Sequence, residues 1–176
     1  MVKSKKLIPL DFIVDKLTNS IQNTISGDSF DTEVLRFTNA DLKQTTKNKG
    51  WNFNWSVEFK DNTKEVFKLT IPRNANIIQG LLSFSLEPDH VYLHLLENAP
   101  FNIGKNKLYE GVAGNLVAHA CKVSFQQGFD GFVGFTAKTK LKEHYQETLG
   151  AYTLGGQRMV IPTEAAQVLI NKYFKS

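Results

Sequence analysis

The spacing of apolar residues changes along the chain, and each part of the sequence predicts a different element. Residues 11–26 carry apolar side chains at helical intervals, with Gly27 as a stop, and they predict a helix. The apolar positions are Phe12, Ile13, Leu17, Ile21 and Ile25. Residues 33–38 are typical of a short strand, and the polar, lysine-rich residues 43–50 predict a loop or a helix end.

An aromatic stretch follows at residues 51–59. Its apolar side chains alternate with polar ones, and this period of two predicts a strand. They are Trp51, Phe53, Trp55, Val57 and Phe59. These five side chains would share one face of the strand, and the first expectation is that this face packs in the core. A face turned to solvent would instead be a binding platform for nucleic-acid bases or an aromatic substrate. The sequence leaves both open.

The middle of the chain is typical of an antiparallel meander. Residues 66–71 alternate again, and two apolar runs at 77–86 and 91–96 flank a compact turn at 87–89. After Pro100 the period changes to that of a helix at 111–127, which Gly128 ends. In this helix Asn115, His119, Lys122 and Gln126 form a polar stripe, so we expect His119 to be solvated.

The last third alternates between the two kinds of element. Residues 129–137 predict a buried strand, 141–149 a short helix, and 151–154 with 158–161 a hairpin around Gly155-Gly156. Residues 163–174 predict a closing helix. The order predicts one α/β (α+β) domain over residues 1–176, with a mixed sheet flanked by helices. The sheet is expected to be mostly antiparallel at first and then to contain a β–α–β crossover.

Composition narrows the class of protein. Hydrophobic residues make up 41% of the 176 and charged residues 22%, as in soluble globular domains. No run approaches the roughly 18 apolar residues of a membrane span, so we expect no membrane contact. The presence of one cysteine fits a protein of the reducing cytoplasm, which is the expected location. The single cysteine, Cys121, excludes an intramolecular disulfide and a cysteine-based zinc site. No histidine pairs with acids at metal-ligand spacing, so no metal is expected.

Charge alone does not identify the partner. The net charge of +4 suits an anionic small ligand as well as a nucleic acid. The lysines are spread along the chain instead of forming one basic cluster, which makes nucleic acid the least favoured partner.

The start of the helix at residue 111 carries the strongest candidate chemistry. Small residues at Gly111, Ala113 and Gly114 let another group approach the backbone, and the unpaired N–H groups of a helix start attract phosphate. Nearby lysines are Lys105, Lys107, Lys138, Lys140 and Lys142. The alternative is that these glycines only allow close packing of the helix.

Taken as a whole, residues 91–161 resemble the core of the GNAT superfamily of acyl-CoA-dependent N-acyltransferases. The resemblance rests on a strand ending near Pro100, the Gly111-Val-Ala113 loop, a helix with Ala120 and Ser124 that leads to Gly128, the strand 131–137, the run His144-Tyr145-x-x-x-Leu149-Gly150-Ala151, and Met159 on a final strand. It implies a single GNAT-like domain. Residues 1–75 would be the substrate side, 76–161 the acyl-CoA-binding core and 162–176 a C-terminal helix.

The resemblance also implies a reaction and its site. An acyl group, acetyl as the first expectation, would pass directly from acetyl-CoA to an unidentified amine acceptor. The strand end would pair with the pantetheine arm, and the loop at residue 111 would hold the pyrophosphate of coenzyme A. The implied cofactor-binding residues are Leu96, Glu97, Asn98, Lys107, Gly111, Val112, Ala113, Gly114, Asn115 and Tyr145. A homodimer is compatible with this interpretation.

Three residues are candidates for catalysis. Tyr145 matches the tyrosine that protonates the leaving thiolate in the family, although a merely half-buried helix residue is the alternative. An amine needs a base, for which Glu97 at the strand end is the first choice and His94 the second. For both, a packing role is an equal alternative.

A second functional class stays open beside the enzyme. Leu108 stands where the family often has Gln or Arg, and no Asn lies near Lys138 to hold the pantetheine arm. These departures favour a catalytically weak or inactive module that binds coenzyme A or another partner.

Overall fold

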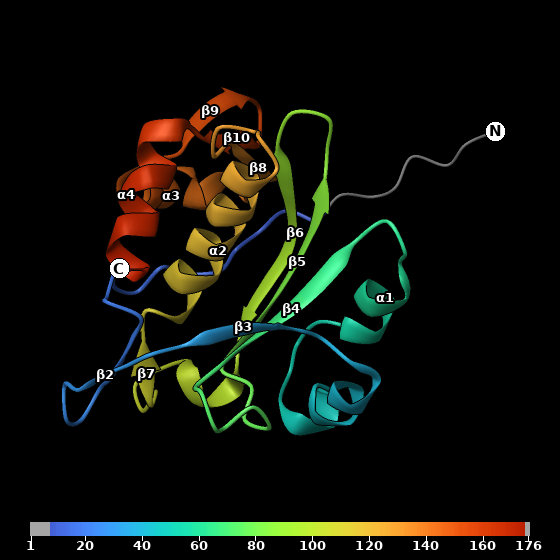
Figure 1. Ribbon diagram of the computed structural model, residues 1–176, viewed down its shortest axis with the longest axis vertical. Coiled ribbons are helices and arrows are strands. Elements are labelled where there is room, and N and C mark those ends of the chain that lie inside the picture. The colour runs from blue at the N-terminus through green and yellow to red at the C-terminus, as the bar shows by residue number, and fades with distance from the viewer. Residues whose placement is uncertain (1–7, 175–176) are drawn as a thin grey trace.

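The computed structural model describes residues 8–174, which form two β-sheets with helices packed around them (Figure 1). The strands are β1 Ile21–Asn23, β2 Ser29–Phe30, β3 Glu33–Arg36, β4 Glu65–Thr70, β5 Gly80–Leu86, β6 Val91–Asn98, β7 Tyr109–Glu110, β8 Val133–Thr136, β9 Tyr152–Gly155 and β10 Arg158–Ile161. The α-helices are α1 Trp55–Lys60, α2 Val112–Gln126, α3 Lys142–Leu149 and α4 Thr163–Tyr173. Four 3₁₀ helices span Asn39–Gln44, Lys47–Lys49, Pro100–Asn102 and Thr139–Leu141.

The main sheet has seven strands in the order β3-β4-β5-β6-β8-β10-β9. All neighbours in it are antiparallel except β6 and β8, which are parallel and joined through α2. The predicted antiparallel meander and the β–α–β crossover are therefore confirmed. A second sheet of three short strands, β2-β1-β7, lies beside the start of α2.

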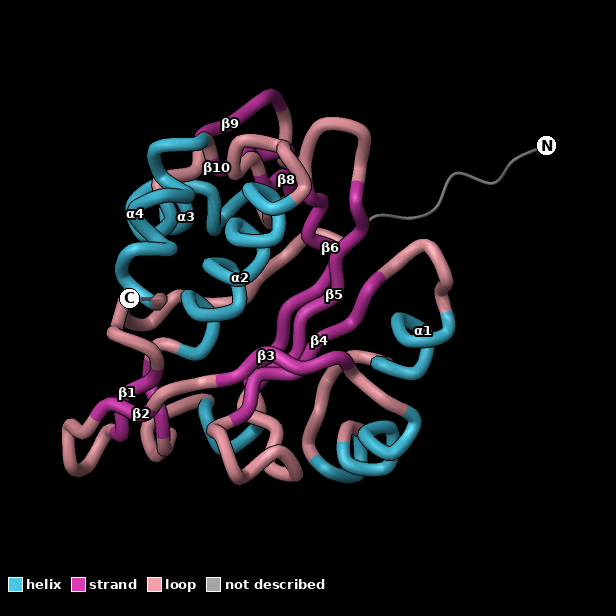
Figure 2. The backbone as a smooth tube through the Cα atoms, in the orientation of Figure 1, coloured by secondary structure: helices cyan, strands magenta, loops and turns pink. Residues whose placement is uncertain are grey.

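Helices α2, α3 and α4 gather around the β6–β8 half of the sheet, whereas α1 lies beyond β4 (Figures 1 and 2). Helix α2 packs against β5, β6 and β8 and also against α4, so it is buried on most sides. This corrects the predicted polar stripe. Asn115 is fully buried, and the His119 ring packs against Phe67 and Phe84 instead of facing solvent.

The predicted helix at residues 11–26 is wrong. Residues 11–18 have no regular secondary structure, and the chain then forms β1 and β2. Burial in this stretch alternates: Leu10, Phe12 and Val14 are 2%, 8% and 4% exposed, while Ile13 between them is 51% exposed. An extended segment thus buries every second side chain, which a helix cannot do.

The predicted strand at residues 51–59 is also wrong, because helix α1 begins at Trp55. Asn54 caps this helix, with its side chain accepting from the Val57 N–H. Trp51 and Trp55 are 4% and 1% exposed, but Val57 is 60% exposed, so the five apolar residues share no face. Both tryptophans belong to the core, as first expected, and neither forms an exposed platform.

The remaining predicted elements are confirmed with changed bounds. The strand predicted at 129–137 shortens to Val133–Thr136, because Gly131 takes a positive φ of 83° in the turn before it. The helices at 111–127, 141–149 and 163–174, and the hairpin at residues 151–161, lie within one or two residues of their predicted positions.

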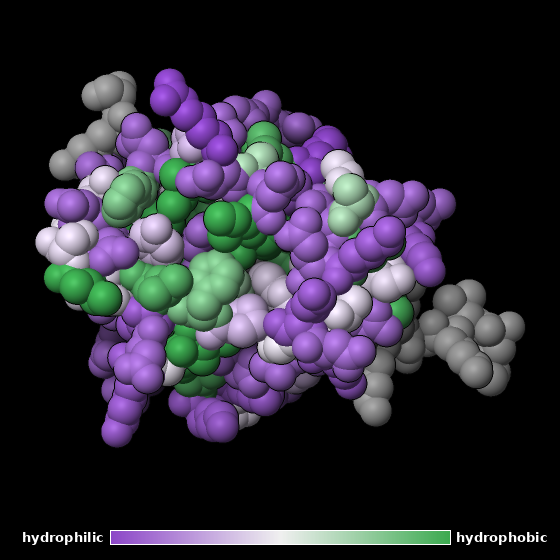
Figure 3. Space-filling model, turned by 90° about the horizontal axis from the view of Figure 1, so that it is seen from below, coloured by the Kyte–Doolittle hydropathy of each residue, from purple (hydrophilic) through white to green (hydrophobic). Residues whose placement is uncertain are grey.

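One end of the molecule carries a concentration of apolar surface (Figure 3). Phe101, Ile103 and Leu108 are each more than a third exposed, and the Phe30 ring packs edge-on against Tyr109.

Within residues 8–174, no helix is both long enough and apolar enough to cross a membrane.

Candidate active site

The parallel strands β6 and β8 pair only over a short stretch and then diverge. Val91, Tyr92 and Leu93 pair with β8, but β6 continues to Asn98. At His94 the register with β5 shifts by one residue, since Ser83 pairs with Leu95 and Phe84 with Leu93. Such a bulge bends a strand and increases its twist. The β8-facing edge of β6 beyond His94 therefore borders a gap in the sheet.

The N-terminal segment, residues 8–18, enters this gap. Neighbouring residues of a strand turn their backbone groups to opposite edges. The Ala137 N–H donates to Gln157 beside β10, so Thr136 and Lys138 turn toward β6. Both contact Leu10, whose N–H donates to Thr136 O over 2.7 Å and whose carbonyl accepts from Lys138 N over 3.0 Å. The segment thus occupies the position next to β8 that β6 has left.

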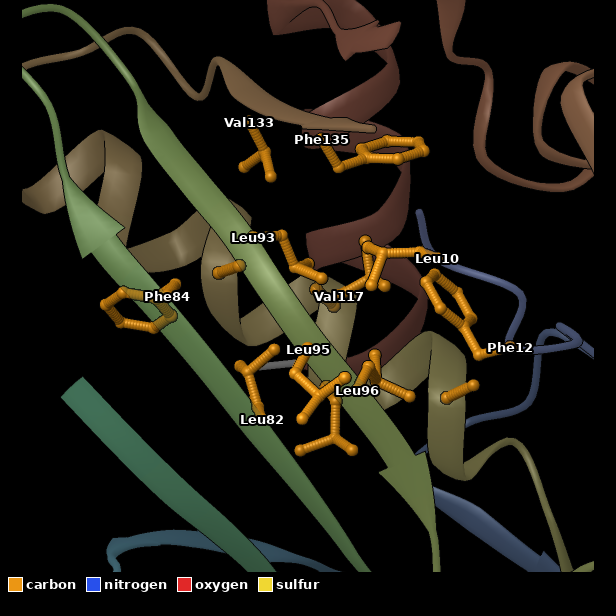
Figure 4. Close-up of a cluster of buried hydrophobic side chains, with 14 of the residues drawn as sticks. Leu10, Phe12, Leu82, Phe84, Leu93, Leu95, Leu96, Val117, Val133 and Phe135 are labelled. Atoms are coloured by element: carbon orange, nitrogen blue, oxygen red, sulfur yellow. The ribbon is translucent and has the colours of Figure 1, made fainter. Parts of the chain in front are cut away.

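The side chains of the segment complete the core at this point. Leu10, Phe12 and Val14 belong to the same buried cluster as β6, β8 and α2. Figure 4 shows Leu10 and Phe12 in the same cluster as Leu96 of β6 and Phe135 of β8. The gap is therefore closed by residues that come from the far end of the sequence.

Tyr145 of α3 lies directly beneath this segment. Its hydroxyl donates to the Phe12 carbonyl over 2.7 Å, and its ring contacts Phe12 and Phe135. The side chain is fully buried. Burial, and then the nearby Asp11 carboxylate, raise the pKa of the Tyr145 phenol. The phenol is therefore neutral, and it already has an acceptor in the protein's own backbone. Next to it, His144 Nε2 accepts from the Val14 N–H over 3.0 Å.

The start of α2 also contacts the N-terminal segment. Gly111 precedes the helix in the left-handed region, with φ 89°, and its N–H donates to Asp15 Oδ1 over 3.2 Å. Lys107 Nζ binds the other oxygen of the same carboxylate over 2.9 Å. A carboxylate of the chain thus sits on the helix start and lysine for which the sequence predicted a phosphate.

The small residues at the start of α2 are tightly packed. A side chain at Gly111 would collide with the Thr18 hydroxyl, and one at Gly114 with the Tyr173 hydroxyl of α4. Val112, Ala113, Gly114 and Asn115 are all buried. The Asn115 side chain donates to Thr32 over 2.9 Å, pointing toward β3. Close packing of the helix, the alternative weighed from the sequence, thus accounts for Gly114.

Glu97 holds the chain that precedes α1. Its Oε2 accepts from Asn52 N over 2.7 Å, and its Oε1 accepts from Phe53 N over 3.3 Å and from Trp55 Nε1 over 2.8 Å. The residue is 5% exposed. A carboxylate offers about four acceptor positions, so three are taken by this protein's own donors and one remains on Oε2.

His94 lies away from the gap. Its Nε2 is 2.8 Å from Ser85 Oγ, and its ring packs edge-on against Tyr92. It lines a different hollow, together with Glu58 and Lys64. Burial, and then the Lys64 ammonium, lower the pKa of His94. The structure therefore separates the two candidate bases, since only Glu97 borders the gap.

A cavity of about 390 Å³ remains in the gap, between the end of β6 and the N-terminal segment. Leu96, Glu97 and Asn98 line one wall and Phe12 and Asp15 another. The Asn98 Oδ1 is buried and has no hydrogen-bond partner among the described residues. No backbone hydrogen bond within residues 8–174 joins the segment to β6, so this edge of β6 remains available to a ligand.

The structure thus gathers most of the candidate residues at one place. Leu96, Glu97, Asn98 and Lys107 line the cavity, Gly111 lies next to Lys107, and Tyr145 lies beneath Phe12. The sequence interpretation missed the N-terminal segment and Asp15 in particular. The signal that could have revealed it is the apolar series Leu10, Phe12 and Val14 at every second position, flanked by Asp11 and Asp15. No group of three His, Cys, Asp or Glu side chains suited to a metal ion occurs among the described residues.

Comparison with solved structures identifies the fold. The chain is similar to AtaTR bound with acetyl-CoA, with 17% identity, a TM-score of 0.56, and coverage of 79% of this chain and 98% of that one. The chain has a GNAT-like fold. A spermidine N-acetyltransferase SpeG chimera from Vibrio cholerae and hSSAT is similar too, at 15% identity and a TM-score of 0.54, covering 78% and 98% of the two chains. No family model and no curated protein matches the chain.

The GNAT-like fold agrees with the resemblance drawn from the sequence motifs. A second AtaT structure is similar as well, with 18% identity, a TM-score of 0.55, and coverage of 79% of this chain and 98% of that one. It is the structure of a Tyr-to-Phe mutant of the toxin bound to the C-terminus of the antitoxin AtaR and to acetyl-CoA. At identities this low the similarity shows the fold alone.

Proposed function

We propose that this protein is an acyl-CoA-dependent N-acyltransferase, with acetyl-CoA as the first donor to test. The observation that carries the proposal is the gap between β6 and β8, which has an unpaired strand edge on one side and a helix start with a lysine at one end. Structures of similar fold contain acetyl-CoA. A thioester with a pantetheine arm and a pyrophosphate has the amide and anionic groups that such a gap can bind.

The described residues have the chemical groups that this ligand needs. The Ala99 N–H turns toward β5, where it donates to Gln79, and the direction alternates from residue to residue, so the backbone groups of Leu96 and Asn98 lie on the free edge of β6. They can pair with the amides of pantetheine, as a further strand would. The Gly111 N–H and the Lys107 ammonium already hold one anion, the Asp15 carboxylate, and a pyrophosphate is a stronger anion for the same donors. The fit requires that Asp15 leave this position.

The chemistry that the ligand supplies is an activated acyl group on sulfur. In the proposed reaction the amine nitrogen forms a bond to the thioester carbon, the carbon–sulfur bond breaks, and the thiolate leaves. An N–H at the end of β6 would stabilise the charge on the carbonyl oxygen. Tyr145 would give its proton to the thiolate, because its hydroxyl is a proton donor and the departing sulfur would take the place of the Phe12 carbonyl that now accepts its hydrogen bond.

The amine must lose a proton, and the geometry favours Glu97 over His94 for this step. Glu97 lines the cavity at the free edge of β6, whereas His94 lines another hollow. The remaining acceptor position on Glu97 Oε2 would take the proton through a water molecule. The unpartnered Asn98 Oδ1 would accept a hydrogen bond from the amine and hold it beside the thioester.

A second candidate function is a GNAT-like module without transferase activity, and one observation favours it. The N-terminal segment contributes three side chains to the core and occupies both the β8 edge and the helix start. If the segment never leaves, the ligand has no access to Tyr145 or Gly111. A cytoplasmic location, a homodimer, and the assignment of residues 1–75 to the acceptor side stay predictions under either function.

The test is release of free coenzyme A from acetyl-CoA across a panel of amines, with Tyr145→Phe as the variant. We expect turnover that depends on an amine, and a fall of about 10²–10³-fold in kcat for Tyr145→Phe without any loss of coenzyme A affinity. Phenylalanine is the chosen replacement because it removes only the hydroxyl and keeps the ring contacts with Phe12 and Phe135. Equal kcat for both proteins would remove Tyr145 from the mechanism, and no turnover with any amine would favour the inactive module.

A further inference from the structure

We propose that the N-terminal segment, residues 8–18, is an intrasteric gate: it occupies the acyl-donor groove as a substitute ligand and must leave before acyl-CoA binds. This inference rests on the proposed function. It adds that the N-terminal segment and acyl-CoA compete for the same binding groups of the protein.

The first contact is on the backbone of β8. Leu10 binds Thr136 O and Lys138 N with its own N–H and carbonyl, as one residue of an added parallel strand. The segment thus fills the β8 side of the gap. A pantetheine arm that spans the gap from β6 to β8 would need the same space.

The second contact is on Tyr145. The proposed acid donates its proton in a 2.7 Å hydrogen bond to the Phe12 carbonyl. A phenol has one proton to donate, so this bond and a bond to a departing thiolate exclude each other. The Phe12 ring also packs against the Tyr145 ring in a tilted orientation, with 4.9 Å between ring centroids. Phe12 lines the cavity and separates Tyr145 from it.

The third contact is on the anion site. Asp15 occupies the Gly111 N–H and the Lys107 ammonium, both proposed for the pyrophosphate. Gly111 carries no side chain, and the space beside it holds the Thr18 hydroxyl, which belongs to the same segment. A single stretch of chain therefore blocks the backbone, acid and anion contacts together.

The structure also provides a point at which the segment can swing away. Ser20 has a φ of 58°, a left-handed conformation that is uncommon outside glycine, and it separates the segment from β1. Strand β1 is held by β2 and β7 through contacts of its own. Detachment up to Ser20 also requires the Tyr173 hydroxyl to release Lys16 O and Thr18 N, whereas the chain after Ser20 keeps its own contacts.

The experiment compares coenzyme A binding by calorimetry in the wild type, Asp15→Ala and Asp28→Ala. Asp28 is an exposed residue of the β1–β2 turn, so its variant matches the charge change of Asp15→Ala without touching the groove. Because the gate competes with the ligand, opening it raises the apparent affinity. We expect Asp15→Ala to bind coenzyme A at least about tenfold more tightly than the wild type and Asp28→Ala to bind like the wild type.

Hydrogen exchange on the wild-type protein tests the gate without any substitution. Saturating coenzyme A should speed exchange at the Leu10 and Val14 amides, which lose their acceptors Thr136 O and His144 Nε2. Binding with unchanged protection at these two amides, or equal affinities for the wild type and Asp15→Ala, would overturn the gate and leave the proposed function intact. Absence of binding in all three proteins would overturn the proposed function, and the gate with it.

Discussion

Replacing Glu97 by alanine should unfold the region before α1, because one buried carboxylate satisfies three donors there. The donors are the N–H groups of Asn52 and Phe53 and the indole N–H of Trp55. A hydrogen bond to a charged group contributes about 1.5–3 kcal/mol, and buried donors left without a partner add to the loss. The bonds to Asn52 and Trp55 are short, at 2.7 and 2.8 Å, and the one to Phe53 is longer, at 3.3 Å.

Counting the two short bonds in full predicts that Glu97→Ala lowers the free energy of unfolding by about 3–5 kcal/mol. For a chain of this size that is a fall in Tm of roughly 6–20 °C. Denaturation followed by tryptophan fluorescence measures it directly, because both tryptophans of the protein, Trp51 and Trp55, lie in this region. Glu33→Ala, on the exposed edge strand β3, is the matched control and should change stability by less than about 0.5 kcal/mol.

A double-mutant cycle isolates the contact with the indole. Trp55→Phe removes the N–H donor, so Glu97→Ala should cost about 1–2 kcal/mol less in that background than in the wild type. A loss below about 1 kcal/mol for Glu97→Ala, or strictly additive effects with Trp55→Phe, would refute the anchoring role and leave Glu97 free to act only as a base.

Two further predictions concern the packing and titration of α2. Gly114→Ala should destabilise the protein by about 1–3 kcal/mol despite the better helix propensity of alanine, because the new methyl group would collide with the Tyr173 hydroxyl; chemical denaturation with unchanged or increased stability would contradict this packing. His119 has its pKa lowered to about 4 by burial and then by Lys122, and its Nε2 has no partner among the described residues. The unfolded chain therefore binds the proton more readily, so the wild type should lose up to about 3 kcal/mol of stability from this group as the pH falls from about 6.5 to about 4. His119→Phe should lack that part of the loss, and parallel stability curves for the two proteins over this pH range would contradict the assignment.

The sequence predicted the second half of the fold well because the signals there are local. Helix α2 has its helical period and a glycine at each end, and the β9–β10 hairpin turns at Gly155-Gly156. The resemblance to the GNAT superfamily, which rests on the order of these elements, also implied that Gly111, Tyr145 and the end of β6 belong to one site. These relations depend on short stretches of chain and on the usual pairing of neighbouring elements.

The first half was predicted poorly because its conformation depends on distant partners. Val14 binds a residue 130 positions away, and Leu10 binds the backbone at the end of β8. The helical spacing of Phe12, Leu17 and Ile21 competed with the alternation of Leu10, Phe12 and Val14, and only the gap beside β8 decides between them. Trp51 and Trp55 were misassigned to a strand for the same reason, since Glu97 of β6, which lies 42 residues after Trp55, holds the chain before α1.

A crystal structure of the protein with acetyl-CoA would show directly whether the gap between β6 and β8 is the acyl-donor site. We expect the pantetheine arm to lie along the free edge of β6 at residues 95–98 and the pyrophosphate to bind the Gly111 N–H and Lys107. Asp15 and Phe12 should have moved away from these groups. Acetyl-CoA bound at another place, or bound with Asp15 still on Gly111 and Phe12 still on Tyr145, would contradict it.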